Sequence, residues 1–486
     1  MAYVTQMQLI ERFLAKGAAA AMTLEQFIKA MIDEWDNSKE LELMLTGQRY
    51  YEGEPDILKR IRKVIGEGGE LEEVKNLANN KLVHNFVRKL VNQKVGYLLS
   101  LPFSIQTNNK DYLEELNKFF DKAFMRSFQN LGKEAINKGK AWLHVYYNED
   151  GELSFKQIPS EEIIPLWKDA AHTELDAVIR IYQLDGFNGT EKTTITKVEY
   201  WDRNGVKRYI LIEGELVPDV EAGEESSHFM GVVNGEEQGY NWEKVPFVCF
   251  KYNHEEIPLI KFVKSLVDDY DKHKSDNSNN LEDLPNGIYV LKNYDGQDLG
   301  EFRRNLSLYR AVKVTDEGGV DTLTVDDDIE AYKHHLETTR KDIFEFGGGV
   351  DTQIERFGTD RSGVALKFLY ADLDMDANII ESEFQASLEQ LRWFIDQHIY
   401  NTTGDDYSEE NVDFIFNRDI IINENDVIMN AKNSVGVISK ETIVSNHPWV
   451  TNVQDELERI EEERQEEFNS YFNAFGPVTG DNNGEE

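Results

Sequence analysis

The sequence predicts an elongated α+β protein that is mainly α. Apolar residues recur at helical spacing over residues 1–140 and again after Pro258. Between these two parts, residues 142–252 contain short runs rich in β-branched and aromatic residues. A helical pattern also runs from Ser362 to about Tyr400, and at roughly 1.5 Å per residue it spans on the order of 55 Å. A helix of that length favours an elongated shape.

The charge balance argues against a protein that recognises specific DNA sequences. The chain has 486 residues, with 52 Lys and Arg against 91 Asp and Glu, and its formal net charge is −39. Hydrophobic residues make up 40% of it, which is too many for a disordered acidic polymer. Its length suggests about three domains. Because the negative charge repels phosphates at long range, we expect no broad basic face that binds DNA tightly.

The cysteine content and the N-terminus also limit the class of protein. The single cysteine, Cys249, excludes an intrachain disulfide, and its apolar surroundings indicate a buried strand. No signal peptide is visible, because Glu11 and Arg12 interrupt any apolar core. No apolar stretch approaches the roughly 18 residues that would span a bilayer. We therefore expect a soluble, intracellular protein with no membrane partner.

Local signals place several elements in the first half of the chain. Thr23 and Gln26 have the spacing of a capping box before a helix, and a second helix is expected near Asn80–Ser100. Strands are expected at 142–147, 193–201 and 209–212. Turn sequences at Asn148–Gly151 and Asp202–Gly205 indicate hairpins.

After Pro258 a helical pattern returns and ends in the polar stretch Lys274–Asn280. A compact mixed segment follows before the next helix. Its expected elements are a strand near Gly287–Leu291, a helix over Asp298–Tyr309, and strands near Ala311–Val314 and Thr322–Val325.

The next helix is predicted over residues 326–346. Asp326, Asp327 and Asp328 put three carboxylates at its N-terminus, where the helix dipole favours negative charge. Its apolar seam predicts packing against another helix, and it consists of Ile329, Tyr332, Leu336, Thr339, Ile343 and Phe346. Gly347, Gly348 and Gly349 end the helix and permit left-handed backbone, so we interpret them as a hinge before a loop.

The C-terminal part is predicted to be helical from about Asn423, and Gly476–Glu486 to be disordered. Residues 455–467 are mostly acidic. They form either a solvated helix face or an interaction surface for a basic partner.

Motifs for catalysis and cofactor binding are incomplete. Gly358–Gly363 has the glycine spacing of a phosphate-binding loop, but Val364 and Ala365 replace the required Lys and Ser/Thr. The series from Asp372 to Glu383 resembles a calcium loop but lies inside a helical pattern. The pair His334–His335 cannot face one side of a helix. We therefore expect no catalytic residues, no cofactor and no metal site.

Taken in order, six stretches of the chain resemble the portal proteins of tailed bacteriophages, in the branch common among long-tailed phages and prophages of Gram-positive bacteria. Their order is more specific than any one of them, and together they extend over nearly the whole chain. They are Tyr50–Gly53 with Asp56–Leu58, Asn79–Val87, Gly96–Pro102, Phe357–Phe368, Gly436–Thr442 and Ser445–Trp449.

The resemblance implies a subunit with a wing, a stem, a clip and a helical crown. The implied divisions are a wing at 1–255, β-rich over 140–252, stem helices at 256–283 and 326–346, a clip at 284–325, a tunnel loop at 347–361, a long helix and wing return at 362–422, a crown at 423–475 and a tail at 476–486. The implied tunnel-loop and hinge residues are Gly347, Gly348, Gly349, Asp351, Arg356, Asp360 and Arg361. The implied stem-packing residues are Ile329, Tyr332, Leu336 and Ile343.

The resemblance also implies partners and a location. We expect a ring of about twelve copies at one capsid vertex, with double-stranded DNA passing through it without sequence specificity. The implied protein partners are the terminase large subunit, a head-completion or adaptor protein, the scaffold and the major capsid protein. The chain would reside in the virion, after assembly in the host cytoplasm, and would not be an enzyme.

Two other functions remain open at this point. Another head–tail connector would share the acidity but lack two stem helices that enclose a clip. A metal-dependent nuclease would use Asp326, Asp327, Asp328 or the Asp372 series to hold divalent ions.

Overall fold

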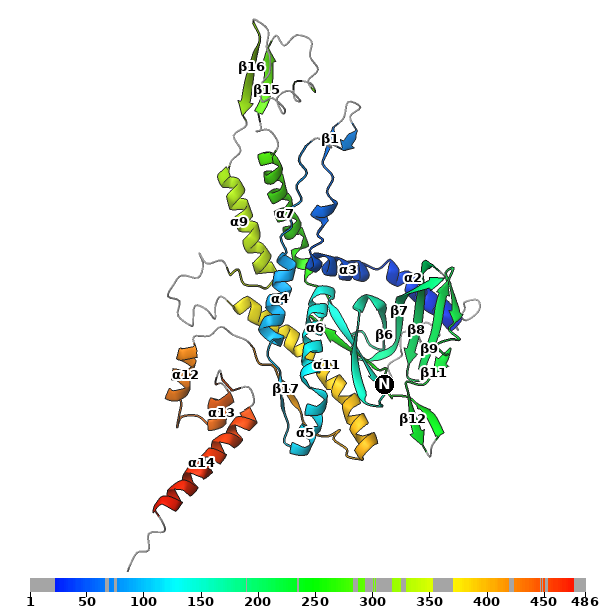
Figure 1. Ribbon diagram of the computed structural model, residues 1–486, viewed down its shortest axis with the longest axis vertical. Coiled ribbons are helices and arrows are strands. Elements are labelled where there is room, and N and C mark those ends of the chain that lie inside the picture. Colours follow the sequence, from blue (N-terminus) through cyan, green and yellow to red (C-terminus); the bar gives the residue numbers. More distant parts are fainter. Residues whose placement is uncertain are drawn as a thin grey trace, which may run out of the picture.

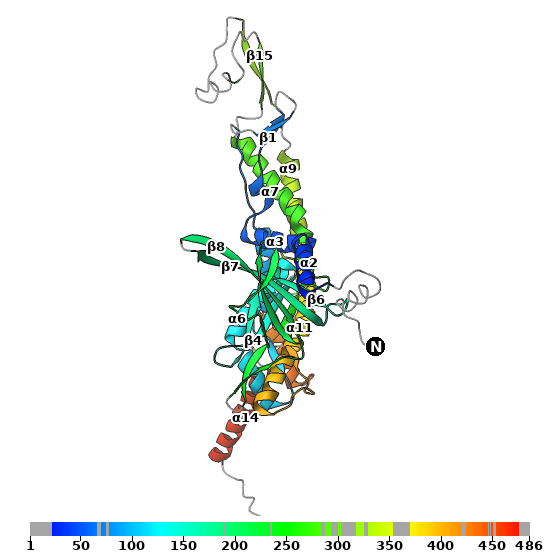
Figure 2. The same ribbon diagram turned by 90° about the vertical axis from the view of Figure 1, so that its right-hand side faces the viewer.

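The computed structural model describes residues 22–65, 70–73, 77–188, 190–233, 236–282, 287–292, 300, 302, 317–324, 329–352, 370–418, 424–445, 447, 449–450 and 453–475. The molecule is elongated, with a central body of helices and sheets (Figure 1). Two helices project from the body and carry a β-hairpin at their far end, while the last helix extends from the opposite end (Figures 1 and 2). The fold is therefore α+β and elongated, as the sequence predicts.

The N-terminal part of the body is mostly helical. Its helices are α2 (Leu24–Asp36), α3 (Lys39–Glu52), α4 (Phe86–Leu99), α5 (Lys110–Phe119) and α6 (Lys122–Lys138), with the 3-10 turns η1 (Asp56–Lys59) and η2 (Ser160–Glu162). The capping box is confirmed, because the Thr23 and Gln26 side chains each accept a hydrogen bond from the other residue's backbone N–H.

The prediction that residues 1–140 are helical misses short strands. Antiparallel β1 (Lys63–Ile65) and β2 (Leu71–Glu73) form a hairpin, and β3 (Ser104–Gln106) pairs with β17 (Asp413–Ile415). The β-branched pair Val64–Ile65, followed by three glycines within four residues, is a strand-and-turn signal that outweighs the helical spacing around it.

The β-rich part forms a large antiparallel sheet and a smaller one. The strands are β4 (Lys140–Tyr147), β5 (Leu153–Ile158), β6 (Ile163–Trp167), β7 (Leu175–Asn188), β8 (Glu191–Asp202), β9 (Gly205–Ile212), β10 (Glu215–Pro218), β11 (Glu225–Ser226), β12 (Phe229–Val233), β13 (Glu236–Tyr240) and β14 (Phe247–Lys251). The large sheet has the order β10-β9-β8-β7-β6 with β11 beside β9, and the smaller has the order β14-β4-β5. Both predicted hairpin turns are confirmed.

The two faces of the large sheet pack against different elements. Alternate residues of β7 point to opposite faces, so Ile179 packs with Ile28 and Trp35 of α2, while Val178 packs with Trp142 and Phe247 of the smaller sheet. The large sheet therefore lies between α2 and the smaller sheet. Cys249, on β14, is buried in the second of these clusters, as predicted.

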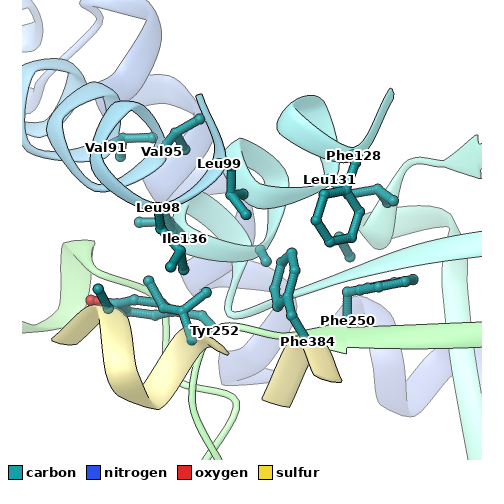
Figure 3. Packing of buried hydrophobic residues seen from close by; sticks show 14 of the residues in the cluster. Val91, Val95, Leu98, Leu99, Phe128, Leu131, Ile136, Phe250, Tyr252 and Phe384 are labelled. Atoms are coloured by element: carbon teal, nitrogen blue, oxygen red, sulfur yellow. The ribbon is translucent and has the colours of Figure 1, made fainter. Parts of the chain in front are cut away.

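The main core lies where α4, α6, β14 and the long helix α11 (Ala371–Thr403) meet. Figure 3 shows the apolar side chains of these elements converging on one another. At its centre, the ring of Phe128 packs against those of Phe250 and Phe384, with centroids 5.8 and 5.4 Å away. This contact holds together α6, β14 and α11, three segments that are far apart in the sequence.

The two projecting helices are α7 (Ile260–Glu282) and α9 (Ile329–Phe346), which together we call the helical arm. The hairpin at its end, called the tip hairpin, consists of β15 (Gly287–Lys292) and β16 (Gly319–Thr324). The strand predicted near Gly287–Leu291 is therefore confirmed. Most of the helix predicted at 298–309, the strand at 311–314 and Asp326–Asp328 lie outside the described residues.

The C-terminal part is helical, as predicted. It consists of α12 (Glu424–Asn433), α13 (Lys440–Ser445) and α14 (Val453–Phe475). The expected tail at 476–486 lies outside the described residues. Among the described helices, none is both long and apolar enough to cross a membrane.

We predict that Phe128→Ala lowers the free energy of unfolding by about 3–5 kcal/mol, because it removes the ring at the meeting point of the core. Chemical denaturation followed by tryptophan fluorescence measures this change. Phe187→Ala is the matched control, since that side chain is 74% exposed. Equal effects of the two changes would contradict this description of the core.

Candidate functional site

The helical arm contains the predicted stem-packing residues, which all lie on α9. Leu336, Thr339 and Ile343 of α9 are buried, and Val263 and Val267 of α7 belong to the same core cluster as Leu336 and Ile343. The predicted seam on α9 therefore has a partner in its own chain, which the sequence alone did not reveal.

The seam is less buried towards its two ends. Tyr332 is partly buried, and its hydroxyl lies 3.4 Å from the backbone carbonyl of His273. Ile329 and Phe346 are each 62% exposed. Packing between the two helices is thus concentrated in the middle of α9.

A buried ion-pair network fixes the point where α7 leaves the body. Glu256, in the turn before α7, lies 2.7 Å from the ammonium of Lys140 and 2.7 Å from Nδ1 of His172. Lys140 also pairs with Glu40 of α3 at 2.6 Å. Burial opposes ionisation of Glu256, but Lys140, His172 and Lys251 outweigh it and lower the pKa of Glu256 to about 2.

The chain between α3 and α4 is bound along α7. Arg60 pairs with Asp276, and the backbone N–H of Leu82 donates to Ser275. The backbone N–H of His84 donates to the buried carboxylate of Asp271 at 3.0 Å. Polar contacts therefore extend along one side of the arm, while the apolar seam faces α9.

A glycine turn ends α9 and packs on α4. Gly348 has a φ of 57°, and the N–H of Gly349 donates to the carbonyl of Phe344 at 2.8 Å. A Cβ atom on Gly349 would lie 2.3 Å from Cδ2 of Leu90. These glycines are therefore required for close approach to α4, a role in addition to the predicted hinge.

The turn is also bonded to α4 through polar groups. The Gln93 amide donates to the carbonyl of Val350 at 2.7 Å and accepts from its N–H at 3.2 Å. Arg340 forms two 2.8 Å bonds with Asp351, which is buried. The predicted tunnel-loop residue Asp351 thus pairs with α9.

Lys94 joins both sides of the segment 353–369. Its side chain is 1% exposed, and its ammonium lies 2.7 Å from Asp376 on α11 and 3.0 Å from the carbonyl of Gly348. The Tyr252 hydroxyl also donates to Asp376, at 3.0 Å. Burial lowers the pKa of Lys94, and the negative charge of Asp376 opposes that shift. One cation thus holds α4, the end of the glycine turn and the start of α11.

The calcium-like series is helical, and Asp374, Asp376 and Glu381 in it have cationic or phenolic partners. Asp374 accepts from the Tyr97 hydroxyl at 2.9 Å and pairs with Arg418. Arg418 also pairs with Glu381 at 2.5 Å. The helical interpretation of this series is confirmed.

Several predicted residues cannot be placed. Arg356, Asp360 and Arg361, together with the Gly358–Gly363 spacing, lie outside the described residues. Lys94, Gln93 and Arg340 were not predicted from the sequence. The sequence did contain a signal for a buried lysine at position 94, because Lys94 lies between the apolar residues of α4 that form the core face.

Comparison with known proteins gives the family. A family model described as phage portal protein, SPP1 Gp6-like, matches residues 31–469. The chain belongs to this portal protein family. The portal protein of Bacillus phage SPP1 is 32% identical over 462 residues, covering 94% of this chain and 89% of that protein. The portal protein of Clostridium phage phiCD119 is 32% identical over 461 residues, covering 91% and 97%.

The portal chain also has distant structural neighbours. A chain in "Neck of empty GTA particle computed with C6 symmetry" has a TM-score of 0.39 at 10% identity and covers 74% of this chain and 88% of that one. One in "Neck of native GTA particle computed with C12 symmetry" has a TM-score of 0.37 at 11% identity, covering 75% and 89%. Because these scores are low, the family assignment depends on the sequence matches.

We predict that Lys94→Met destabilises the portal chain by about 2–3 kcal/mol, because it leaves the partly buried carboxylate of Asp376 without its cation. Adding Asp376→Asn to Lys94→Met should recover part of the loss. Thermal and chemical unfolding measure both effects.

The matched control is Lys118→Met, at a 63% exposed lysine in a surface pair with Glu115. Its effect should stay within about 0.5 kcal/mol. A Lys94→Met protein as stable as this control would contradict the anchoring role of Lys94.

Proposed function

We propose that this portal chain assembles into a ring of about twelve copies that forms the channel for double-stranded DNA at one capsid vertex. The membership in the portal family supports the proposal most directly. The arrangement of the chain supports it too, since the helical arm projects from a broad body and carries a small β element at its far end (Figure 1).

In this proposal each part of the chain has a place in the ring. The helical arm is the stem, the tip hairpin belongs to the clip, and the body that holds the β-rich part is the wing. The segment from Gly347 to Arg361 is the tunnel loop, and α12, α13 and α14 form the crown. Lys94 then fixes the two flanks of the tunnel loop to the wing, at Gly348 and at Asp376.

The charge of the chain suits a channel through which DNA slides. Each Lys or Arg that binds a phosphate releases counterions and makes the complex harder to leave. A chain with a net charge of −39 has fewer cationic side chains than carboxylates, so it offers few groups that would hold a phosphate. DNA passage would therefore be independent of sequence and would need force from another protein.

The partners follow from that position. The clip would dock the terminase large subunit during packaging and a head-completion or adaptor protein afterwards. The scaffold and the major capsid protein would surround the wing. The chain itself would have no catalytic role and no cofactor, and it would reside in the virion after assembly in the host cytoplasm.

Negative-stain electron microscopy of the purified chain tests the assembly. We expect end-on views of a ring with a central hole, because head-to-tail contacts of one chain close into a cycle. Monomers at all concentrations and salt conditions would contradict the proposal. DNA cleavage by the pure chain with Mg²⁺ or Mn²⁺ would favour the nuclease alternative instead.

The glycine turn gives a test of the tunnel-loop assignment. Gly349→Val places a branched side chain against Leu90, so we expect the turn to shift away from α4. Rings should still form, but packaging by the complete motor in vitro should fall several-fold.

Gly186→Val, in β7, is the control because a Cβ there has ordinary contacts at 3.9 Å. If rings of the Gly349→Val protein packaged DNA at the unmutated level, the close approach of this turn to α4 would have no role in DNA passage.

A further inference from the structure

Three metal-binding side chains meet across the helical arm. Asp269 and His273 are four residues apart on α7 and so lie on one face of that helix. His335 reaches them from α9. Its Nε2 is 2.8 Å from one carboxylate oxygen of Asp269, and Nε2 of His273 is 3.3 Å from the other. The two imidazole rings have centroids 4.7 Å apart.

This set of atoms matches the ligands of a transition-metal ion. The three ligand atoms all lie within 4.8 Å of one another. A tetrahedral zinc ion, with bonds of about 2.0–2.2 Å to nitrogen and oxygen, separates its ligand atoms by about 3.3 Å. All three side chains are between 39% and 46% exposed, so small rotations bring them to that spacing. Two imidazoles and one carboxylate favour zinc-like ions over Mg²⁺ or Ca²⁺, which prefer oxygen ligands.

We propose that Asp269, His273 and His335 form a binding site for a zinc-class divalent ion that joins α7 to α9. The fourth position would be open to water or to a ligand from a neighbouring molecule. This site is separate from the function proposed above, which requires no metal.

The metal would add a connection between α7 and α9 on the exposed side of the seam. Leu336, Thr339 and Ile343 hold the middle and base of α9 against α7 and the body. His335 lies beside that seam on the exposed side of the arm. An ion bound to both helices would oppose their separation, and with it the opening of the arm towards the tip hairpin.

Without a metal ion the same residues interact with one another directly, and the experiment must distinguish this state from the metal-bound one. A carboxylate accepts hydrogen bonds, so without an ion the His335 imidazole donates its Nε2–H to Asp269. Metal binding requires the opposite tautomer, with the proton on Nδ1 and the Nε2 lone pair free. A substitution that keeps the donor but removes the lone pair therefore distinguishes the two states.

The test is a Co²⁺ titration of the untagged full-length chain after treatment with a chelator. Four-coordinate Co²⁺ has a strong visible absorption, and we expect about one ion per chain, displaced by Zn²⁺. His335→Gln keeps a donor for Asp269 but lacks the imidazole, so it should weaken binding at least about tenfold. His273→Ala should do the same, whereas His334→Ala, at the exposed neighbouring histidine, should bind normally.

Thermal unfolding supplies a second measurement. Zn²⁺ should raise the unfolding temperature of the unmutated chain and of His334→Ala, and should not raise that of His335→Gln. Absence of the four-coordinate spectrum, or full binding in His335→Gln, would overturn the proposal. Ring formation by microscopy is independent of this result, so failure of the metal site and failure of the channel proposal are distinguishable.

Discussion

The buried ammonium of Lys94 is the interaction on which the arrangement of the functional parts depends. It lies between the end of the glycine turn and the start of α11, and it is 1% exposed. A charge that far from water is stable only beside a fixed partner, so Asp376 and the carbonyl of Gly348 must keep their positions. The two described ends of the chain between those residues are therefore held at fixed points.

Buried ion pairs also fix the base of the helical arm. Glu256 is buried among Lys140, Lys251 and His172, and its low pKa shows that ionisation is favoured by these partners. Lys140 connects this turn to α3 through Glu40. Replacing Lys140 by an apolar residue would remove a cation from the buried Glu256, and so the direction of α7 is specified by more than apolar packing.

Local patterns in the sequence predicted much of the fold, and contacts between distant residues explain the rest. The capping box at Thr23 and the strand at Gly287 depend on neighbouring residues, and both were correctly predicted. The position of Lys94 was not, because its partner Asp376 is 282 residues away. The proposed metal ligands are similar, since Asp269 and His335 are 66 residues apart and neither belongs to a known motif. The order of motifs identified the family, whereas the anchoring residues required the structure.

The excess of carboxylates has a structural role, in addition to the role proposed for it in DNA passage. Several buried or partly buried cations of the body contact more than one carboxylate: Lys140 contacts Glu40 and Glu256, and Arg418 contacts Asp374 and Glu381. An ion-paired cation has less to gain from a phosphate, because binding DNA would require giving up a carboxylate that is already desolvated. A sliding channel needs few strong phosphate contacts, and an excess of carboxylates achieves this in two ways. It repels the polymer at long range, and it occupies the cations that would otherwise hold it.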